Sequence, residues 1–146
     1  MEIPRRGIPV TEIASRLGNN INGTNGHAFR FAFIDACDTA NGNLCSALGI
    51  KTTPNVPLQT YANSLIRPSA YCGWPSAKSI AMVFSGSANH DHTNFMTHLQ
   101  FIWYNYPQTI HVAAIQAAGF NDSYGMLNND LVINGYWDLM PSAFNH

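Results

Sequence analysis

The apolar residues of the chain recur with the period of a helix in some segments and with the pattern of a buried strand in others. From Val10 to Leu17, apolar residues recur at i, i+3, i+4 and i+7, which predicts an amphipathic helix over residues 11–18. Within residues 29–36, apolar residues occupy both of the faces that a strand would have, and the exceptions are Arg30 and, near the end, Asp35. That pattern is typical of a strand in a sheet that is covered on both sides.

The rest of the sequence continues the alternation of helices and strands. Two further strands and three further helices are predicted, at residues 69–74 and 131–136 and at residues 44–48, 94–105 and 109–118. Gly119 is expected to end the last helix, and residues 52–65 and 86–91 are interpreted as a surface excursion and a loop. Residues 79–84 fit either a strand or a helical turn. The order of elements predicts an α/β three-layer sandwich with a mainly parallel sheet.

Composition and charge exclude several classes of partner. The 146 residues are 46% apolar, enough for the core of one domain over residues 1–146. Only 10% are charged and the net charge is -1, so no basic surface for nucleic acid or anionic lipid is expected. No apolar run approaches the roughly 20 residues of a membrane span, and no signal peptide is recognised. The compartment is left open, with the cytoplasm favoured.

The three cysteines differ in where the predicted elements put them. An odd and sparse set does not suggest a disulfide scaffold. Cys45 falls on a helix face and Cys72 inside a strand, where a free thiol usually packs as a small apolar side chain. Cys37 alone stands at the end of a strand. Because ligands of α/β proteins bind outside the carboxyl ends of the strands, Cys37 is the candidate nucleophile.

The sequence around Cys37 resembles a known family. Residues 33–40 read Phe-Ile-Asp-Ala-Cys-Asp-Thr-Ala, which resembles the cysteine strand of the caspase-like (clan CD) peptidases and especially the Ala-Cys-Glu-Thr block of CHAT domains. The preceding helix, a small apolar helix after Gly42, a strand ending at Trp74-Pro75 and a closing strand follow in the order of that family. The specific match is limited to four or five residues around Cys37.

The resemblance implies an activity and a site. It implies a cysteine-type endopeptidase, a hydrolase that acts on a peptide or protein and needs no cofactor, with Cys37 as the catalytic nucleophile. Asp35, Asp38 and Trp74 are candidate substrate-binding residues. Two alternatives stand beside these roles, turn capping by Asp38 or Thr39 and packing of Trp74 in the core.

The resemblance also implies that this chain lacks the segment carrying the family's catalytic histidine. The catalytic histidine of the family comes from the strand before the cysteine strand, and this chain is expected to begin after it. His27 precedes the cysteine strand and is expected at the opposite end of the sheet from Cys37. The chain is therefore expected to be a partial domain that lacks its N-terminal strands. A cysteine nucleophile needs a base within hydrogen-bond reach, so little activity is expected of the chain alone.

A non-catalytic protein-interaction module on the same fold is the alternative function. In that case Cys37 is a packing residue, and the free edge of the sheet pairs with another chain, as uncovered edges tend to do. An upstream segment or a second chain would complete the sheet.

A second group of residues, His90, Asp91, His92 and His98, was weighed as a metal site. Zinc requires three or four converging ligands, and this spacing matches no known signature. A polar loop with Asp91 or Thr93 as the N-cap of the following helix explains the residues more simply. No metal is predicted.

Overall fold

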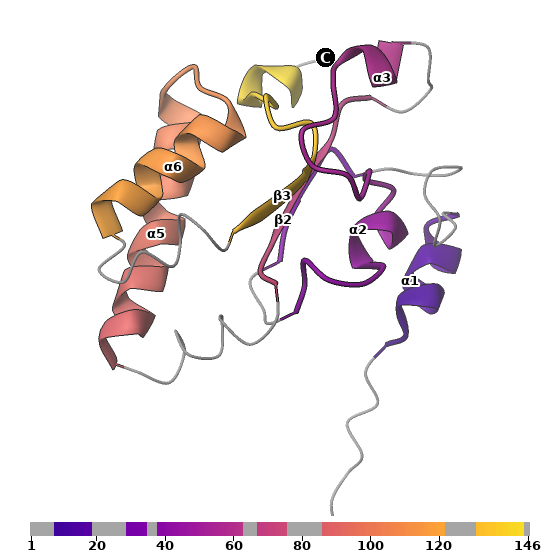
Figure 1. The fold of residues 1–146 in the computed structure, drawn as a ribbon, viewed down its shortest axis with the longest axis horizontal. Helices are drawn as coiled ribbons and strands as arrows, with labels where there is room; N and C mark the ends of the chain where they lie inside the picture. The colour runs from indigo at the N-terminus through magenta and orange to yellow at the C-terminus, as the bar shows by residue number, and fades with distance from the viewer. Residues whose placement is uncertain are drawn as a thin grey trace, which may run out of the picture.

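The chain forms a mixed α/β structure with one small sheet, seen in the computed structural model of Figure 1. The residues that the structure describes are 8–18, 29–34, 38–62, 67–75, 86–121 and 131–144. The three strands of the sheet are β1 (Phe31–Phe33), β2 (Ala70–Gly73) and β3 (Val132–Gly135), in that order. β1 runs parallel to β2, whereas β3 runs antiparallel to it. The sheet is therefore mixed, and a mainly parallel sheet is not confirmed.

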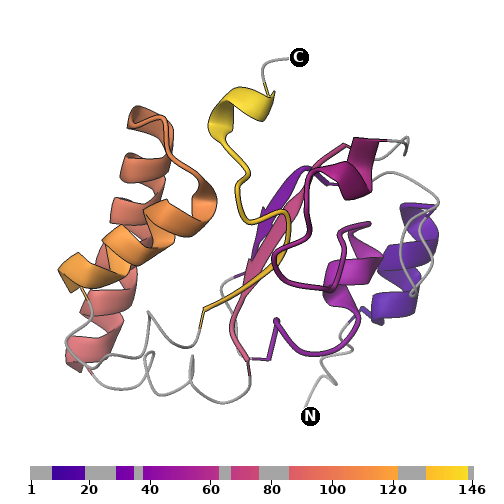
Figure 2. The same ribbon diagram turned by 45° about the horizontal axis from the view of Figure 1, so that its top comes forward.

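Helices lie on both sides of this sheet. They are α1 (Val10–Arg16), α2 (Leu44–Ala47), α3 (Gln59–Ala62), α5 (Gly86–Asn105) and α6 (Ile110–Asn121), with a 3-10 turn, η1, at Pro141–Phe144. Figures 1 and 2 show α5 and α6 on one side and α1, α2 and α3 on the other. Over the described residues, no helix has the length and hydropathy needed to cross a bilayer.

Side chains that alternate along the strands pack into two separate hydrophobic cores, one on each face of the sheet. Ala70 and Cys72 of β2 point into the larger core, and Tyr71 between them points into a smaller one beside α2. In β1, Phe31 packs against the larger core and Ala32 against the smaller one. β1 therefore has packing partners on both faces, but its three side chains are only partly buried.

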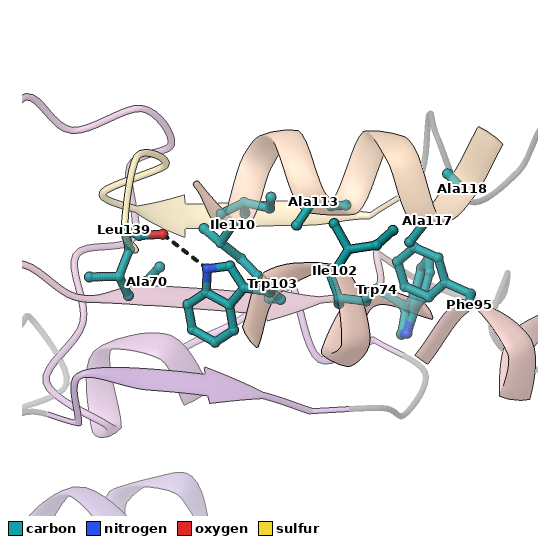
Figure 3. Close-up of a cluster of buried hydrophobic side chains, with 14 residues drawn as sticks. Ala70, Trp74, Phe95, Ile102, Trp103, Ile110, Ala113, Ala117, Ala118 and Leu139 are labelled. Carbon is teal, nitrogen blue, oxygen red and sulfur yellow. Dashed lines mark hydrogen bonds between the residues drawn. The ribbon is translucent and has the colours of Figure 1, made fainter. Parts of the chain in front are cut away.

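The larger core joins the sheet to α5 and α6 (Figure 3). Four apolar side chains of α5 are buried in this core, namely Phe95, Leu99, Ile102 and Trp103. Trp103 also donates a 3.2 Å hydrogen bond from Nε1 to the carbonyl oxygen of Leu139. The facing side of α6 is rich in buried alanines, which let the two helices approach closely.

Several predicted boundaries were wrong. Residues 86–91 are helix, because no proline or glycine interrupts the run from residue 87 to Asn105. Asp91 and Thr93 consequently lie inside α5 and do not cap it. Gly119 does not end α6, which continues to Asn121.

Residues 52–65 are also more than a surface excursion. They contain α3, and Val56 and Tyr61 are buried. Val56 donates its amide to the carbonyl oxygen of Gly135, and Gly135 donates its own to Thr53, at 2.8 and 2.9 Å. These bonds attach the segment to the side of β3 that faces away from β2. Such long-range pairing cannot be predicted from local sequence patterns. Residues 79–84 lie outside the described part of the chain.

Candidate functional site

The candidate site is the connection that leaves β1 toward α2. Cys37 and Asp35, the predicted nucleophile and one predicted substrate-binding residue, lie outside the described residues. The structure describes both ends of the segment that holds them. On one side, Ile34 extends the parallel pairing by donating its amide to the carbonyl oxygen of Cys72 at 3.0 Å. On the other side, the chain resumes in a turn that begins at Asp38.

This turn is fastened to the carboxyl end of β2 mainly through Thr39. The Thr39 hydroxyl donates to the carbonyl oxygen of Ile34 at 3.0 Å and accepts the amide of Trp74 at 3.1 Å. The Thr39 carbonyl oxygen accepts the hydroxyl of Tyr71 at 2.6 Å. The amide of Ala40 adds a 3.0 Å bond to the carbonyl oxygen of Trp74. One residue therefore joins the ends of two parallel strands.

Gly73, the last residue of β2, makes this close contact sterically feasible. A Cβ at this position would lie 2.9 Å from the Thr39 hydroxyl oxygen and 3.1 Å from the amide nitrogen of Ala40. Both distances are shorter than ordinary van der Waals contact. A side chain at position 73 would push the turn away from the strand.

Asp38 has a role in the turn itself. Its φ of 65° lies in the left-handed region, which asparagine and aspartate tolerate better than most residues. Its carboxylate accepts a 2.8 Å hydrogen bond from the side-chain amide of Asn41. The carboxylate is also exposed. The turn role weighed for Asp38 in the sequence is present, and the side chain is still accessible to a ligand.

Trp74 belongs to the core. Its side chain is 0% exposed, and its ring meets Phe33 and Phe95 edge to face, with centroids 6.4 and 6.0 Å apart. In Figure 3 it lies among the buried side chains of α5 and α6. Packing, the alternative to substrate contact in the sequence analysis, accounts for its position.

Cys45 and Cys72 are free, buried thiols, as predicted. Burial raises the pKa of Cys45 from 9.0 to about 12. Burial, together with the nearby Cys45, raises the pKa of Cys72 as well. Both thiols are therefore protonated near neutral pH and poor nucleophiles.

Of the histidines, only His98 and His111 have side chains within the described part of the chain. His27 lies outside the described residues, as do the side chains of His90 and His92. His111 packs against the ring of Trp137, with centroids 4.5 Å apart. Within the described ranges, no three His, Cys, Asp or Glu side chains gather as a metal site would require.

Two hollows lie elsewhere, at the carboxyl end of α5. One, of about 360 Å³, is lined by His98, Phe101, Ile102, Tyr106, Gln108 and Gln116. The other, of about 620 Å³, is lined by residues 104–107 and 140–142. The second hollow adjoins η1, and Ala143 of η1 accepts a hydrogen bond from Arg30 at the start of β1. It therefore lies toward the opposite end of β1 from the turn at Thr39.

The sequence pattern predicts a strand over residues 69–74 but no role for Tyr71 in the site. The signal was a phenol inside an otherwise apolar strand, because a buried tyrosine hydroxyl usually has a hydrogen-bond partner. Here the partner is the main chain of Thr39.

Comparison with known proteins gives no family assignment. No family model, no curated protein and no solved structure matches the chain.

Proposed function

We propose that this chain is part of a caspase-like, CHAT-like domain of the cysteine-peptidase type, with Cys37 at the nucleophile position. The observation that carries the proposal is the parallel pairing of β1 with β2 and the turn that follows β1. The segment holding Cys37 connects the carboxyl end of β1 to a turn fastened at the carboxyl end of β2. In open α/β sheets, ligands bind outside the carboxyl ends of the strands.

The proposed domain is a three-layer sandwich. The helices on both sides of the sheet and the two cores on its two faces support that arrangement. An antiparallel strand beside parallel ones, as β3 is here, is common in α/β sheets. The mixed sheet is thus compatible with the proposed fold.

The proposed chemistry needs a base from another segment. The Cys37 thiolate would attack the carbonyl carbon of a peptide bond, and an imidazole would pass the thiol proton to the leaving amine. Water would then hydrolyse the thioester. Without that imidazole, the neighbouring carboxylates of Asp35 and Asp38 would raise the pKa of the thiol. We therefore propose that the chain alone is inactive or nearly so.

One observation bears on the alternative function, a protein-interaction module, as well as on the enzyme. Arg30 and Ile34 direct main-chain groups toward β2. By the alternation of a parallel ladder, Phe31 and Phe33 direct theirs toward the other edge. Among the described residues, β1 pairs only with β2. An upstream strand would complete the sheet of an enzyme, and a second chain would complete that of an interaction module.

Alkylation of the native protein tests the proposal. Iodoacetamide is applied at pH 7.5, and the modification of each cysteine is followed by peptide mass spectrometry. We expect Cys37 to react at least about tenfold faster than Cys45 and Cys72, whose thiols are buried and protonated. The urea-unfolded protein, in which all three should react alike, is the control. Equal protection of Cys37 in the native protein would overturn the proposal.

The two functions are separated by the oligomeric state. Phe29, half-exposed just before β1, is replaced by lysine, a residue that discourages pairing at a sheet edge. If β1 pairs with a second chain, sedimentation should detect a dimer in the parent protein and a monomer in Phe29→Lys. A monomeric parent protein would count against pairing with a second copy and leave the enzyme as the favoured function.

A further inference from the structure

The smaller hollow at the carboxyl end of α5 is built from two helices and the connection between them. Phe101 and Ile102 come from α5, Gln116 from α6, and Tyr106 and Gln108 from the connection. These residues all lie within the described part of the chain. The volume of about 360 Å³ falls in the range of sites that hold small molecules.

Main-chain hydrogen bonds hold the connection in place. Tyr106 donates its amide to the carbonyl oxygen of Ile102 at 3.1 Å, and Gln108 donates its amide to that of Tyr106 at 2.7 Å. At the start of α6, the buried Ile110 donates its amide to the carbonyl oxygen of Leu139 at 2.9 Å. The hollow is therefore formed by the fold itself, as small-molecule sites usually are.

The wall of the hollow carries two accessible aromatic rings. Phe101 and Tyr106 are 54% and 50% exposed, and their rings meet edge to face with centroids 6.1 Å apart. Aromatic rings pack favourably beside one another in this geometry or offset-stacked. A third ring, supplied by a ligand, would therefore find packing partners here.

One polar atom of the lining lacks a partner. The side-chain Oε1 of Gln108 is buried and accepts no hydrogen bond from the described residues. Leaving a buried acceptor unpaired is unfavourable, and buried polar atoms in native proteins are seldom left so. An N–H donor of a ligand that bonded this oxygen would remove that penalty.

The surroundings carry no formal charge of the usual kind. Residues 92–121, which include both sides of the hollow, contain no Asp, Glu, Lys or Arg. An ionised ligand would lose its hydration without gaining an opposite charge from any of these four residue types. An uncharged ligand is therefore favoured.

We propose that this hollow binds a small, uncharged aromatic molecule that carries an N–H donor. The ring packs against Phe101 and Tyr106, and the donor bonds Oε1 of Gln108. The inference goes beyond the proposed function and does not depend on it, because the hollow shares no residue with the turn at Thr39.

Three probes of nearly equal shape test the ligand class. Benzamide is uncharged and has the donor, acetophenone replaces the amide nitrogen by a methyl group, and benzoate is an anion. Each is titrated into the isotope-labelled full chain near neutral pH and followed by amide resonances. We expect benzamide to shift the resonances of Phe101 and Gln108, including the side-chain amide of Gln108. Benzamide should bind at least about fivefold more tightly than either analogue.

Variants of the lining test the residues. Gln108→Met keeps the length of the side chain and removes its carboxamide, so the preference for benzamide over acetophenone should disappear. The variant should be at least as stable as the parent protein, because an unpaired acceptor is replaced by an apolar group. Gln100→Met, at an exposed glutamine of α5, is the matched control and should bind like the parent. Phe101→Ala should weaken the binding of all probes, and it serves if Gln108→Met does not fold.

Three results would overturn the inference. One is a benzamide titration that leaves the resonances of the lining unmoved or shows no advantage over acetophenone. Another is tighter binding of benzoate, which would make the hollow an anion site beside His98. The third is unchanged benzamide binding in folded Gln108→Met or, failing that, in Phe101→Ala. None of these results bears on the alkylation of Cys37, so the proposed function is tested separately.

Discussion

Arg30 donates a 2.8 Å hydrogen bond from Nη2 to the main-chain carbonyl oxygen of Ala143, 113 residues later. Its Nε donates a second, at 2.9 Å, to the carbonyl oxygen of Pro68. The residue before β1 is thus tied to the segment before β2 and to η1. Burial, and to a smaller extent the charge of Arg67, lower the pKa of Arg30 below its usual value. The one polar residue among the described residues 29–34 thus joins distant parts of the fold.

Replacing Arg30 should destabilise the protein. Arg30→Met keeps an unbranched apolar stem but removes the hydrogen bonds to Pro68 and Ala143, both of which come from a charged donor. We expect the free energy of unfolding to fall by about 2–3 kcal/mol. Urea unfolding followed by tryptophan fluorescence measures the change.

Arg16 provides the matched control. It pairs with Glu12 one helical turn earlier, at 2.6 Å, and its side chain is 77% exposed. Exposed pairs of this kind contribute little, so Arg16→Ala should cost about 0.5 kcal/mol or less. Equal effects of Arg16→Ala and Arg30→Met would show that the two bonds of Arg30 do not stabilise the fold.

Gly73 and Gly119 should respond in opposite directions to alanine. At Gly73 the added methyl group meets Thr39, Tyr71 and the main chain of Ala40 at 2.9 to 3.1 Å. Overpacking of this kind costs about 1–3 kcal/mol. At Gly119, inside α6, the methyl group meets nothing within 4 Å. There alanine should stabilise the helix by about 0.5–1 kcal/mol.

Thermal unfolding of the two variants checks this pair. Gly73→Ala should unfold at a lower temperature than the parent protein, and Gly119→Ala at a higher one. A neutral Gly73→Ala would mean that the turn can move away from β2 without cost, and it would weaken the case for a fixed Thr39.

Much of the fold is readable from local patterns. The helix at α1, the strands at β1, β2 and β3 and the inward faces of α5 follow from apolar spacing alone. The direction of each strand within the sheet does not follow from apolar spacing, because the direction of β3 depends on how the chain returns from α6. The start of α5 was missed for a related reason. Its first residues are polar and lack an apolar period, and the helix is continuous because nothing in the run breaks it.

The site is readable only in part. A thiol after an apolar strand, followed by Asp38 and Thr39, is a local signal, and the turn expected after the thiol is present at residues 38–40. The bonds from Thr39 to Trp74 and from Tyr71 to Thr39 join residues 35 and 32 positions apart. Such pairs depend on the parallel register of β1 and β2, which no local pattern encodes. The same register, with Ala32 opposite Tyr71, brings the turn within reach of the phenol.

The stability of the protein should fall at alkaline pH. Burial raises the pKa of Tyr71 from 10.0 and that of Cys45 from 9.0, both to about 12. Above about pH 9 the unfolded chain therefore releases protons that the folded chain retains, which favours unfolding by up to about 1.4 kcal/mol per pH unit for each group. Near pH 7 both states are protonated at these groups, so the groups do not make the free energy of unfolding depend on pH.

Urea unfolding between pH 7 and pH 11, under reducing conditions, measures this dependence. The free energy of unfolding should stay constant near pH 7 and decrease at higher pH. Tyr71→Phe should be less stable at pH 7 but fall less steeply above pH 10, and an equally steep fall would exclude Tyr71 as a cause.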